Sequence, residues 1–283
     1  MRQKHPLAEH VKFYWSYNPP RNPYSWINEW SAALEGQDDW LVHSSSYLDD
    51  TLGFVTPQMR NEIERIKRND LDYYRYMFLG EPVGLGSNVY NFDLFQKVDG
   101  LKEGEYITSL LYGLDTGHQR SATACICAAF TTEANLYVLE TYYYDPSRLA
   151  RKLAPDEIAA NINQFVTRTS SEYARPIYKM TIDSAEGALR NQYYKDYGVR
   201  WNPVAKKDKL TMIDYVVTML AKGKVFYLDN QSNEVFADQH KTYRYDERSL
   251  QTPSPKVLEV DDHVPDAFQY LVVDNLRELG LIA

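Results

Sequence analysis

The chain has 283 residues, of which 44% are apolar and 25% charged, which is the composition of an ordinary globular protein with a sizeable core. Its net charge of −8 argues against a protein that holds nucleic acid mainly by bulk electrostatics, but it does not exclude a nuclease with an acidic metal site. No apolar run approaches the ~18 residues of a membrane helix, and residues 1–6 lack the apolar stretch of a signal peptide. The two cysteines, Cys125 and Cys127, lie in one apolar run, which indicates buried thiols in a reducing compartment.

The first 87 residues differ in pattern from the rest of the chain. Met59, Ile63 and Ile66 recur at helical spacing behind Pro57, which suits a first helical turn. Residues 80–87 contain three glycines and a proline and are expected to be a linker. The elements expected before it are a short strand at 11–15, a turn at 16–20, a helix at 24–34, a short strand at 40–43, and helices at 57–67 and 71–79.

Residues from 106 onward follow an α/β pattern. Short connections join the first three strands and predict antiparallel hairpins, whereas helices separate the later strands and predict crossovers. The result is a mixed sheet with helices on both faces. We expect strands at 106–114, 121–130, 135–144, 176–182, 199–205 and 224–228, and helices at 155–172, 184–197, 210–221 and 263–279. Residues 230–255 have no clear periodicity and are expected to be irregular.

Three aspartates lie where these elements begin or end. Asp115 ends the first of these strands and Asp183 follows the fourth. Asp266 lies in the first turn of the last helix, with His263 three residues before it on the same face. The first and fourth strands can be neighbours in such a sheet, which would bring two acids together. Buried like charges need a cation, and two Mg²⁺ or Mn²⁺ ions ~4 Å apart activate a water and stabilise the leaving oxygen of a phosphodiester.

Each aspartate also has an ordinary structural interpretation. Asp115 begins an Asp-Thr-Gly sequence that is typical of turns. Asp183 could cap the following helix, with Glu186 completing a capping box. Asp266 could be a first-turn acid that the helix dipole favours. These interpretations are weaker for all three together, because the acids share the edges of one predicted sheet.

Three segments resemble the nuclease motifs of tailed-phage terminase large subunits. They are Tyr112-Gly113-Leu114-Asp115-Thr116-Gly117, Thr181-Ile182-Asp183-Ser184-Ala185-Glu186 and Asp262-His263-Val264-Pro265-Asp266-Ala267-Phe268-Gln269-Tyr270. The resemblance implies an RNase H-like fold and a metal-dependent endonuclease that cuts concatemeric double-stranded DNA during genome packaging. It assigns metal binding to Asp115, Asp183 and Asp266. It also matches His263 to the family's His-x-x-Asp motif and Lys206-Lys207 to a lysine that many members have before the next helix.

The N-terminal part is similar to the end of the family's ATPase domain. Ser16-Tyr17-Asn18-Pro19 resembles its coupling motif, and the stretch from Tyr73-Tyr74-Arg75 to Leu79-Gly80-Glu81 resembles the segment before the interdomain linker. The resemblance implies that residues 1–87 are a remnant of the ATPase domain with its linker, and that residues 88–283 form the nuclease domain. No G-x-x-x-x-G-K-[ST] phosphate loop occurs in the sequence, so we expect no ATP hydrolysis by this chain alone. The chain is therefore interpreted as a split gene product, a prophage remnant or a recombinant piece.

Basic residues cluster between the fourth strand and the following helices. They are Arg190, Lys195, Arg200, Lys206, Lys207 and Lys209. We expect DNA phosphates to be contacted by four of them, which are Arg190, Lys206, Lys207 and Lys209, with binding that weakens steeply with salt. The alternative is a solvated helix face.

The resemblance also implies partners and a location. The partners are double-stranded DNA, the terminase small subunit and the portal protein, and an upstream gene could supply a separate ATPase half. No membrane partner is expected. The location is the cytoplasm of a bacterial host, transiently at the procapsid.

Three rival functions are compatible with parts of the sequence. An aspartic protease is suggested by Asp115-Thr116-Gly117, but that family expects a small residue where His118 stands, and a mostly β chain. Another RNase H-like enzyme, such as a resolvase or transposase, predicts the same metal site and lacks the terminase-like N-terminal part. A non-catalytic remnant that docks other packaging proteins would keep the fold without binding metal.

Overall fold

The structure is a computed structural model, and it describes residues 12–84, 86–117, 121–147, 149 and 151–282. The predictions made for Val11, Leu85 and His118 lie outside the described residues.

A seven-stranded mixed sheet lies at the centre of the fold, in the order β1-β7-β4-β3-β2-β5-β6. β2, β3 and β4 form an antiparallel meander, and the remaining neighbours pair in parallel. The predicted sheet, with antiparallel strands first and crossovers later, is confirmed. The strands are β1 (Gln96–Val98), β2 (Ile107–Asp115), β3 (Thr123–Thr131), β4 (Leu136–Tyr144), β5 (Ile177–Ile182), β6 (Asn202–Pro203) and β7 (Val225–Leu228).

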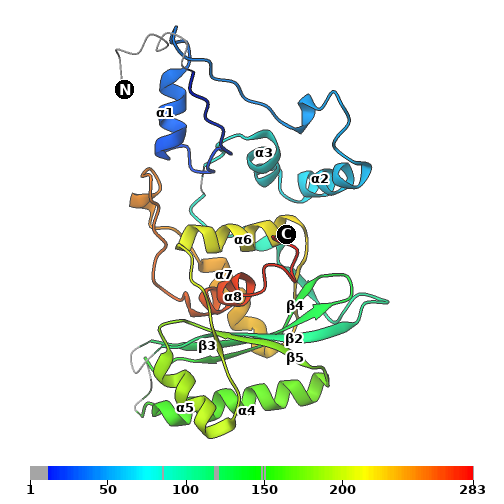
Figure 1. The fold of residues 1–283 in the computed structure, drawn as a ribbon. Helices are drawn as coiled ribbons and strands as arrows, with labels where there is room; N and C mark the ends of the chain where they lie inside the picture. Colours follow the sequence, from blue (N-terminus) through cyan, green and yellow to red (C-terminus); the bar gives the residue numbers. More distant parts are fainter. Residues whose placement is uncertain (1–11, 85, 118–120, 148, 150, 283) are drawn as a thin grey trace.

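Helices cover both faces of the sheet (Figure 1). On one face lie α4 (Pro155–Tyr173) and α5 (Gly187–Tyr197), and on the other α6 (Lys209–Ala221), α7 (Glu234–Thr242) and α8 (His263–Val273). Alternate residues of β4 enter the two cores: Leu136 and Val138 pack in one buried cluster, and Tyr137 and Leu139 in the other. Cys125 and Cys127 are buried free thiols on a single face, as predicted. None of the helices in the described ranges combines the length and apolar character that crossing a bilayer requires.

In the N-terminal part, the residues that the structure describes form three α-helices and one short 3-10 helix (Tyr47–Asp49). The α-helices are α1 (Trp26–Leu34), α2 (Pro57–Asn69) and α3 (Leu71–Leu79), close to the predicted ranges. Their starts have the expected chemistry, because Pro57 begins α2 behind the capping side chain of Thr56, and the Asp70 carboxylate accepts from the Tyr73 N–H at 2.8 Å.

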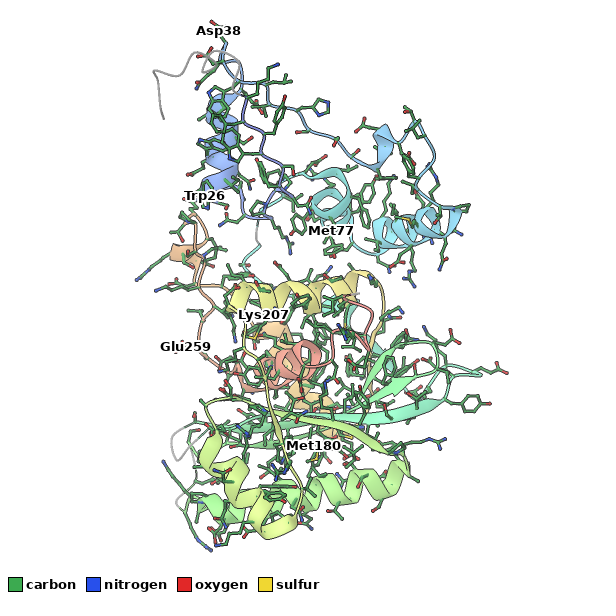
Figure 2. All side chains as sticks on the ribbon, viewed as in Figure 1. Trp26, Asp38, Met77, Met180, Lys207 and Glu259 are labelled. Carbon is green, nitrogen blue, oxygen red and sulfur yellow. The ribbon has the colours of Figure 1, made fainter. Side chains whose placement is uncertain are left out.

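The short strands predicted at 11–15 and 40–43 are wrong for the residues that the structure describes there, which have no strand pairing. Their aromatic side chains pack on α1 instead. The ring of Trp15 lies 5.7 Å from that of Trp30 and 5.5 Å from that of Trp40. Figure 2 shows side chains crowded around this helix, with Trp26 at one end. The tryptophans of these two segments therefore pack on a helix and not in a sheet.

The N-terminal helices contact α6 of the sheet domain. The Tyr73 hydroxyl donates to Thr218 Oγ1 at 2.9 Å, and the Asn69 side chain donates to the Ala221 carbonyl at 3.2 Å. Ile66 of α2 is buried in the same apolar cluster as residues of α6. The two parts of the chain thus share a core at this contact.

Three element boundaries differ clearly from the predictions, and two elements, the helix α7 and the edge strand β1, were not predicted. α5 begins at Gly187 and not at residue 184, α8 ends at Val273 and not at residue 279, and β6 has two residues where seven were expected. Helix α7 lies in the segment that was expected to be irregular. Two of its inward-facing residues, Gln239 and His240, are polar. Apolar residues therefore do not recur at helical spacing along this segment, and the sequence pattern did not indicate a helix.

Candidate active site

Asp115 is the last residue of β2, and Asp183 directly follows β5, its parallel neighbour. β2 pairs with β5 so that Leu114 lies opposite Ile182, and the two aspartates are the next residues along the strands. Because the carboxyl ends of parallel neighbours meet at one edge of a sheet, the two aspartates lie at the same edge. The predicted adjacency of these strands is confirmed.

Helix α8 reaches this edge by packing closely on β2 at Gly113. A Cβ atom at this position would lie 2.2 Å from the Ala267 carbonyl oxygen and 2.8 Å from Leu271 Cβ, which is closer than packed atoms allow. Glycine therefore permits the approach of the helix. The first turn of α8 consequently meets the end of β2, where His263 Nδ1 lies 2.7 Å from Asp115 Oδ2.

Asp115 is buried and forms an ion pair with His263. Burial raises the pKa of the Asp115 carboxyl, the hydrogen bond to His263 opposes this, and the negative charges of Asp266 and Asp183 raise the pKa further. Burial acts to lower the pKa of His263, but the hydrogen bond and the charge of Asp115 outweigh it and raise that pKa. The hydrogen bond and the charge of Asp115 therefore favour the protonated imidazole of His263.

Asp183 is held by three donors. Its Oδ1 accepts from the Ala185 N–H at 2.9 Å, and its Oδ2 accepts from Lys206 Nζ at 2.5 Å and from the Tyr270 hydroxyl at 3.4 Å. Burial acts to raise the pKa of Asp183, but the hydrogen bonds from Ala185 and Lys206 outweigh it and lower the pKa. Asp183 is therefore an ionised acid with a lysine as its counter-ion.

Asp266 has a lysine partner as well. Lys209, the first residue of α6, donates to Asp266 Oδ1, and the Tyr243 hydroxyl donates to the same oxygen at 3.3 Å. The side chain of Asp266 is 16% exposed and that of Lys209 is 32% exposed. The structure therefore gives each of the three aspartates one cationic partner.

The three carboxylates lie near one another without forming a closed set of metal ligands. Burial raises the pKa of Tyr270 most, and the charges of Asp115, Asp266 and Asp183 all raise it further, so this tyrosine lies within the field of all three. Among the residues that the structure describes, no three His, Cys, Asp or Glu side chains are placed to hold a metal ion as they stand. The donor chemistry nevertheless fits Mg²⁺ or Mn²⁺, which prefer carboxylate oxygens.

Comparison with known proteins identifies the family. The terminase RNAseH like domain matches residues 115–274, which is more than half of the chain. The chain belongs to the terminase large subunit family. A second family, described as phage terminase large subunit, matches residues 1–81 of this terminase chain. The predicted family and the RNase H-like fold are both confirmed.

Individual terminases are similar over nearly the whole chain. The terminase large subunit of Bacillus phage SPP1 is 24% identical over 278 residues, which are 95% of this chain and 60% of that protein. Two crystal forms of the large terminase from a thermophilic bacteriophage have the same fold. One superposes with a TM-score of 0.73 at 20% identity, over 92% of this chain and 60% of that one. The other superposes with a TM-score of 0.72 at 17% identity, over 90% of this chain and 61% of that one. This likeness shows the fold. The chain thus spans about 60% of the length of these relatives.

The structure separates the basic residues that were predicted to contact DNA in this terminase chain. Lys206 and Lys209 point at the carboxylates. Lys207 is exposed and lies next to the start of α6 (Figure 2). Among the described residues, no hydrogen bond or ion pair joins Arg190 of α5 to Asp115, Asp183 or Asp266, so the structure does not bring it into the site.

Two tyrosines of the terminase site were missed. Tyr270 is four residues after Asp266, and this spacing on one helix face could have indicated it. Tyr243 follows α7, in the segment expected to be irregular, and no sequence signal marked it. Their hydroxyls are hydrogen-bonded to Asp183 and Asp266 respectively.

The capping-box interpretation of Asp183 is wrong. The residue that precedes α5 is Glu186, and no side chain caps this helix. Asp183 instead closes a short turn, in which the Glu186 N–H donates to the Asp183 carbonyl at 3.1 Å. The Asp183 carboxylate is consequently left at the edge of the sheet with the other two acids.

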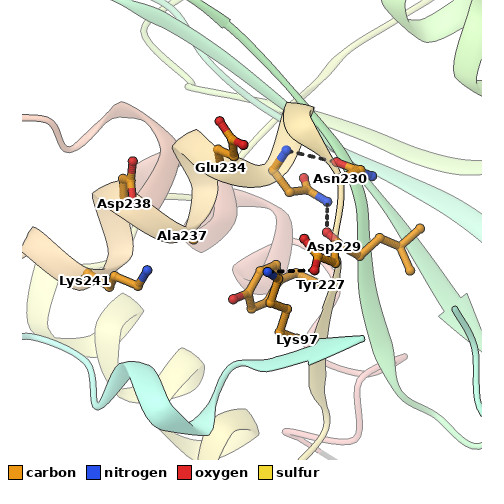
Figure 3. A pocket seen from close by; sticks show the side chains of 10 residues that line it. Lys97, Tyr227, Asp229, Asn230, Glu234, Ala237, Asp238 and Lys241 are labelled. Carbon is orange, nitrogen blue, oxygen red and sulfur yellow. Dashed lines mark hydrogen bonds and ion pairs between the residues drawn. The ribbon is translucent and has the colours of Figure 1, made fainter. Parts of the chain in front are cut away.

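A pocket elsewhere on the terminase fold does not include the site. It lies between β7 and α7 and is lined by Asp229, Asn230, Glu234 and Lys241 among others (Figure 3). Its Asp229 pairs with Lys97 at 2.7 Å. Neither the three aspartates nor His263 line this pocket.

Proposed function

We propose that this chain is the metal-dependent endonuclease part of a phage packaging terminase, which cuts concatemeric double-stranded DNA. The observation that supports the proposal is that three acids meet at one edge of the sheet: Asp115 at the end of β2, Asp183 after β5 and Asp266 in the first turn of α8. The charges of all three act on one side chain, that of Tyr270. Three neighbouring acids that are largely shielded from solvent are costly without cations, and a divalent metal with a DNA phosphate would supply positive charge and complete the site.

Asp115, Asp183 and Asp266 would hold Mg²⁺ or Mn²⁺, as two ions. When bound, the metal supplies an activated water and stabilises the charge on the leaving oxygen of the phosphodiester. The surrounding groups orient the acids. Ala185 and Tyr270 fix the Asp183 carboxylate, and the buried position of Asp115 limits its freedom.

His263 would orient the attacking water, bind a metal weakly or contact the phosphate. Its Nδ1 is already engaged by Asp115, so Nε2 is the nitrogen that remains for this role. The Asp115 carboxylate fixes the ring in the way that a carboxylate partner fixes a catalytic or metal-bound histidine. His263 would thus act through Nε2 at the edge where the acids meet.

DNA would be held by phosphate contacts that carry no sequence information. Lys207 lies next to the site and is exposed to solvent, and Arg190 would contribute from α5. We expect weak sequence preference and steep salt dependence.

The N-terminal part would be the end of a terminase ATPase domain. Residues 1–87 would form this remnant with its linker, and residues 88–283 the nuclease domain. The terminase small subunit, the portal protein and a separate ATPase half would be its partners, in the host cytoplasm and transiently at the procapsid. ATP hydrolysis would not come from this chain alone, because its sequence has no phosphate loop.

Mn²⁺-dependent nicking of a supercoiled plasmid tests the proposal. D183A should lower the nicking rate at least ~100-fold, because it removes a carboxylate that positions the metal. The matched control is D229A, which removes an acid from the pocket between β7 and α7 and should leave nicking unchanged. Circular dichroism should show both variants folded. Undiminished nicking by D183A would refute the assignment.

A further inference from the structure

The three site aspartates are neutralised by three cations of the chain itself. Asp115 faces His263, Asp183 faces Lys206, and Asp266 faces Lys209. The two lysines lie close together in the chain: Lys206 is in the segment that joins β6 to α6, and Lys209 is the first residue of α6, whereas His263 is the first residue of α8. One short segment therefore carries two of the three counter-ions.

The lysines contact the oxygens that a metal ion would need. Lys206 Nζ donates to Asp183 Oδ2, and Lys209 Nζ donates to Asp266 Oδ1. An ammonium on a carboxylate oxygen occupies its lone-pair direction, and its positive charge repels an arriving divalent cation. A metal ion and these ammonium groups therefore compete for the same two carboxylates.

The two lysine side chains are more exposed than the acids of the site. Lys206 follows the buried Val204, whose N–H donates to the Ile182 carbonyl at 2.9 Å, and Lys209 begins α6. The side chains of Lys206 and Lys209 are 39% and 32% exposed, whereas that of Asp115 is 12% exposed. Partly exposed ion pairs of lysine are weak and readily exchanged.

We propose that Lys206 and Lys209 are exchangeable internal counter-ions, which neutralise Asp183 and Asp266 in the metal-free enzyme and are displaced when a divalent ion binds. This inference rests on the proposed function, because it takes the aspartates as metal ligands. The displaced ammonium groups then face the solvent at the site, where a DNA phosphate can take them as partners. Metal and DNA therefore strengthen the binding of one another, because the metal frees the cations that the phosphate uses.

Calorimetric titration of the whole chain with Mn²⁺ tests the exchange without measuring activity. K206M and K209M keep the apolar stems of the lysines and remove their charges. Each should lower the Mn²⁺ dissociation constant roughly 3- to 10-fold, because the competing cation is gone. K207M is the matched control, since Lys207 is exposed between the two and should leave the constant unchanged.

Thermal unfolding gives a second readout. In EDTA both variants should melt below the wild type, and saturating Mn²⁺ should raise their melting temperatures by more than it raises that of the wild type. If K209M does not fold, K206M decides the question alone, because its residue lies outside the helices. An unchanged or weaker Mn²⁺ affinity in folded variants would overturn the exchange.

The outcomes separate this inference from the proposed function. If the wild type binds Mn²⁺ and the lysine variants bind it equally well, the counter-ion exchange fails and the nuclease proposal stands. If the wild type binds no Mn²⁺ even at millimolar concentration, the proposed metal site fails, and the exchange fails with it.

Discussion

Polar side chains in buried surroundings carry most of the chemistry of this molecule. The motif residues Asp115, Asp183, Asp266 and His263 could be identified from the sequence, because acids that end strands and start helices have a recognisable position. The side chains that pair with these residues could not be identified from the sequence. Which lysine faces which acid depends on the path of an irregular segment, and such a path leaves no periodic signal.

Because His240 is buried, we expect the free energy of unfolding to fall in acid. His240 is fully buried among aromatic rings, and burial lowers its pKa from 6.5 to about 3. Below pH 6.5 the unfolded chain takes up a proton that the folded chain does not, so the free energy of unfolding falls as the pH falls from 6.5 to about 3. The slope of this contribution is about 1.4 kcal/mol per pH unit.

Urea unfolding of wild type and H240F at several pH values measures this contribution. The difference in unfolding free energy between the two proteins should change by about 2 kcal/mol from about pH 6.5 to about pH 5, with the wild type losing more. Parallel curves over this range would show that His240 does not titrate on unfolding.

Regular elements were predicted well where burial follows a simple period. β4 alternates Leu136 and Val138 with Tyr137 and Leu139, and the two sets enter opposite cores, as expected. Prediction failed where tertiary contacts determine the structure. α7 turns polar side chains inward: its Gln239 Oε1 accepts from the Val264 N–H of α8 at 2.9 Å, which no pattern in the sequence indicates.

Because α8 packs closely on β2, one methyl group added at Gly113 should destabilise the fold strongly. In G113A the new Cβ would meet the Ala267 carbonyl at 2.2 Å, and the helix backbone has to move. We expect a loss of about 3 kcal/mol in unfolding free energy, which is typical of an overpacked core. Metal binding should weaken as well, because the first turn of α8 shifts away from Asp115.

G187A is the matched control for this helix–strand contact. A Cβ at Gly187 meets no heavy atom within 4 Å, and the residue begins α5. Alanine there should be neutral or stabilise by up to about 1 kcal/mol. Chemical denaturation of both variants checks the comparison, and equal stability of G113A and wild type would contradict the close packing.

At the scale of the whole molecule, the N-terminal helices and the sheet domain share a core. The boundary at residues 87 and 88 was drawn from glycine and proline content and not from packing. Ile66 and Tyr73 lie in the same buried cluster as residues of α6, and the Tyr73 hydroxyl is hydrogen-bonded to Thr218. Such contacts between distant segments cannot be predicted from the composition of a linker.

Removal of residues 1–87 should therefore destabilise the remaining domain. The fragment 88–283 exposes the apolar side of α6 that Ile66 and Tyr73 cover, and we expect its melting temperature to fall by roughly 5–10 °C relative to the full chain. Differential scanning calorimetry measures the shift. Identical melting temperatures would show that the two parts are energetically independent.

The most direct test of the account is the position of a bound metal. A crystal of this chain grown with Mn²⁺ gives anomalous scattering at the metal, which locates it without reference to activity. We expect density at about 2.1 Å from carboxylate oxygens of Asp115, Asp183 and Asp266. The account would be contradicted if metal density appeared only elsewhere, for example in the pocket beside Asp229, and none appeared at these aspartates.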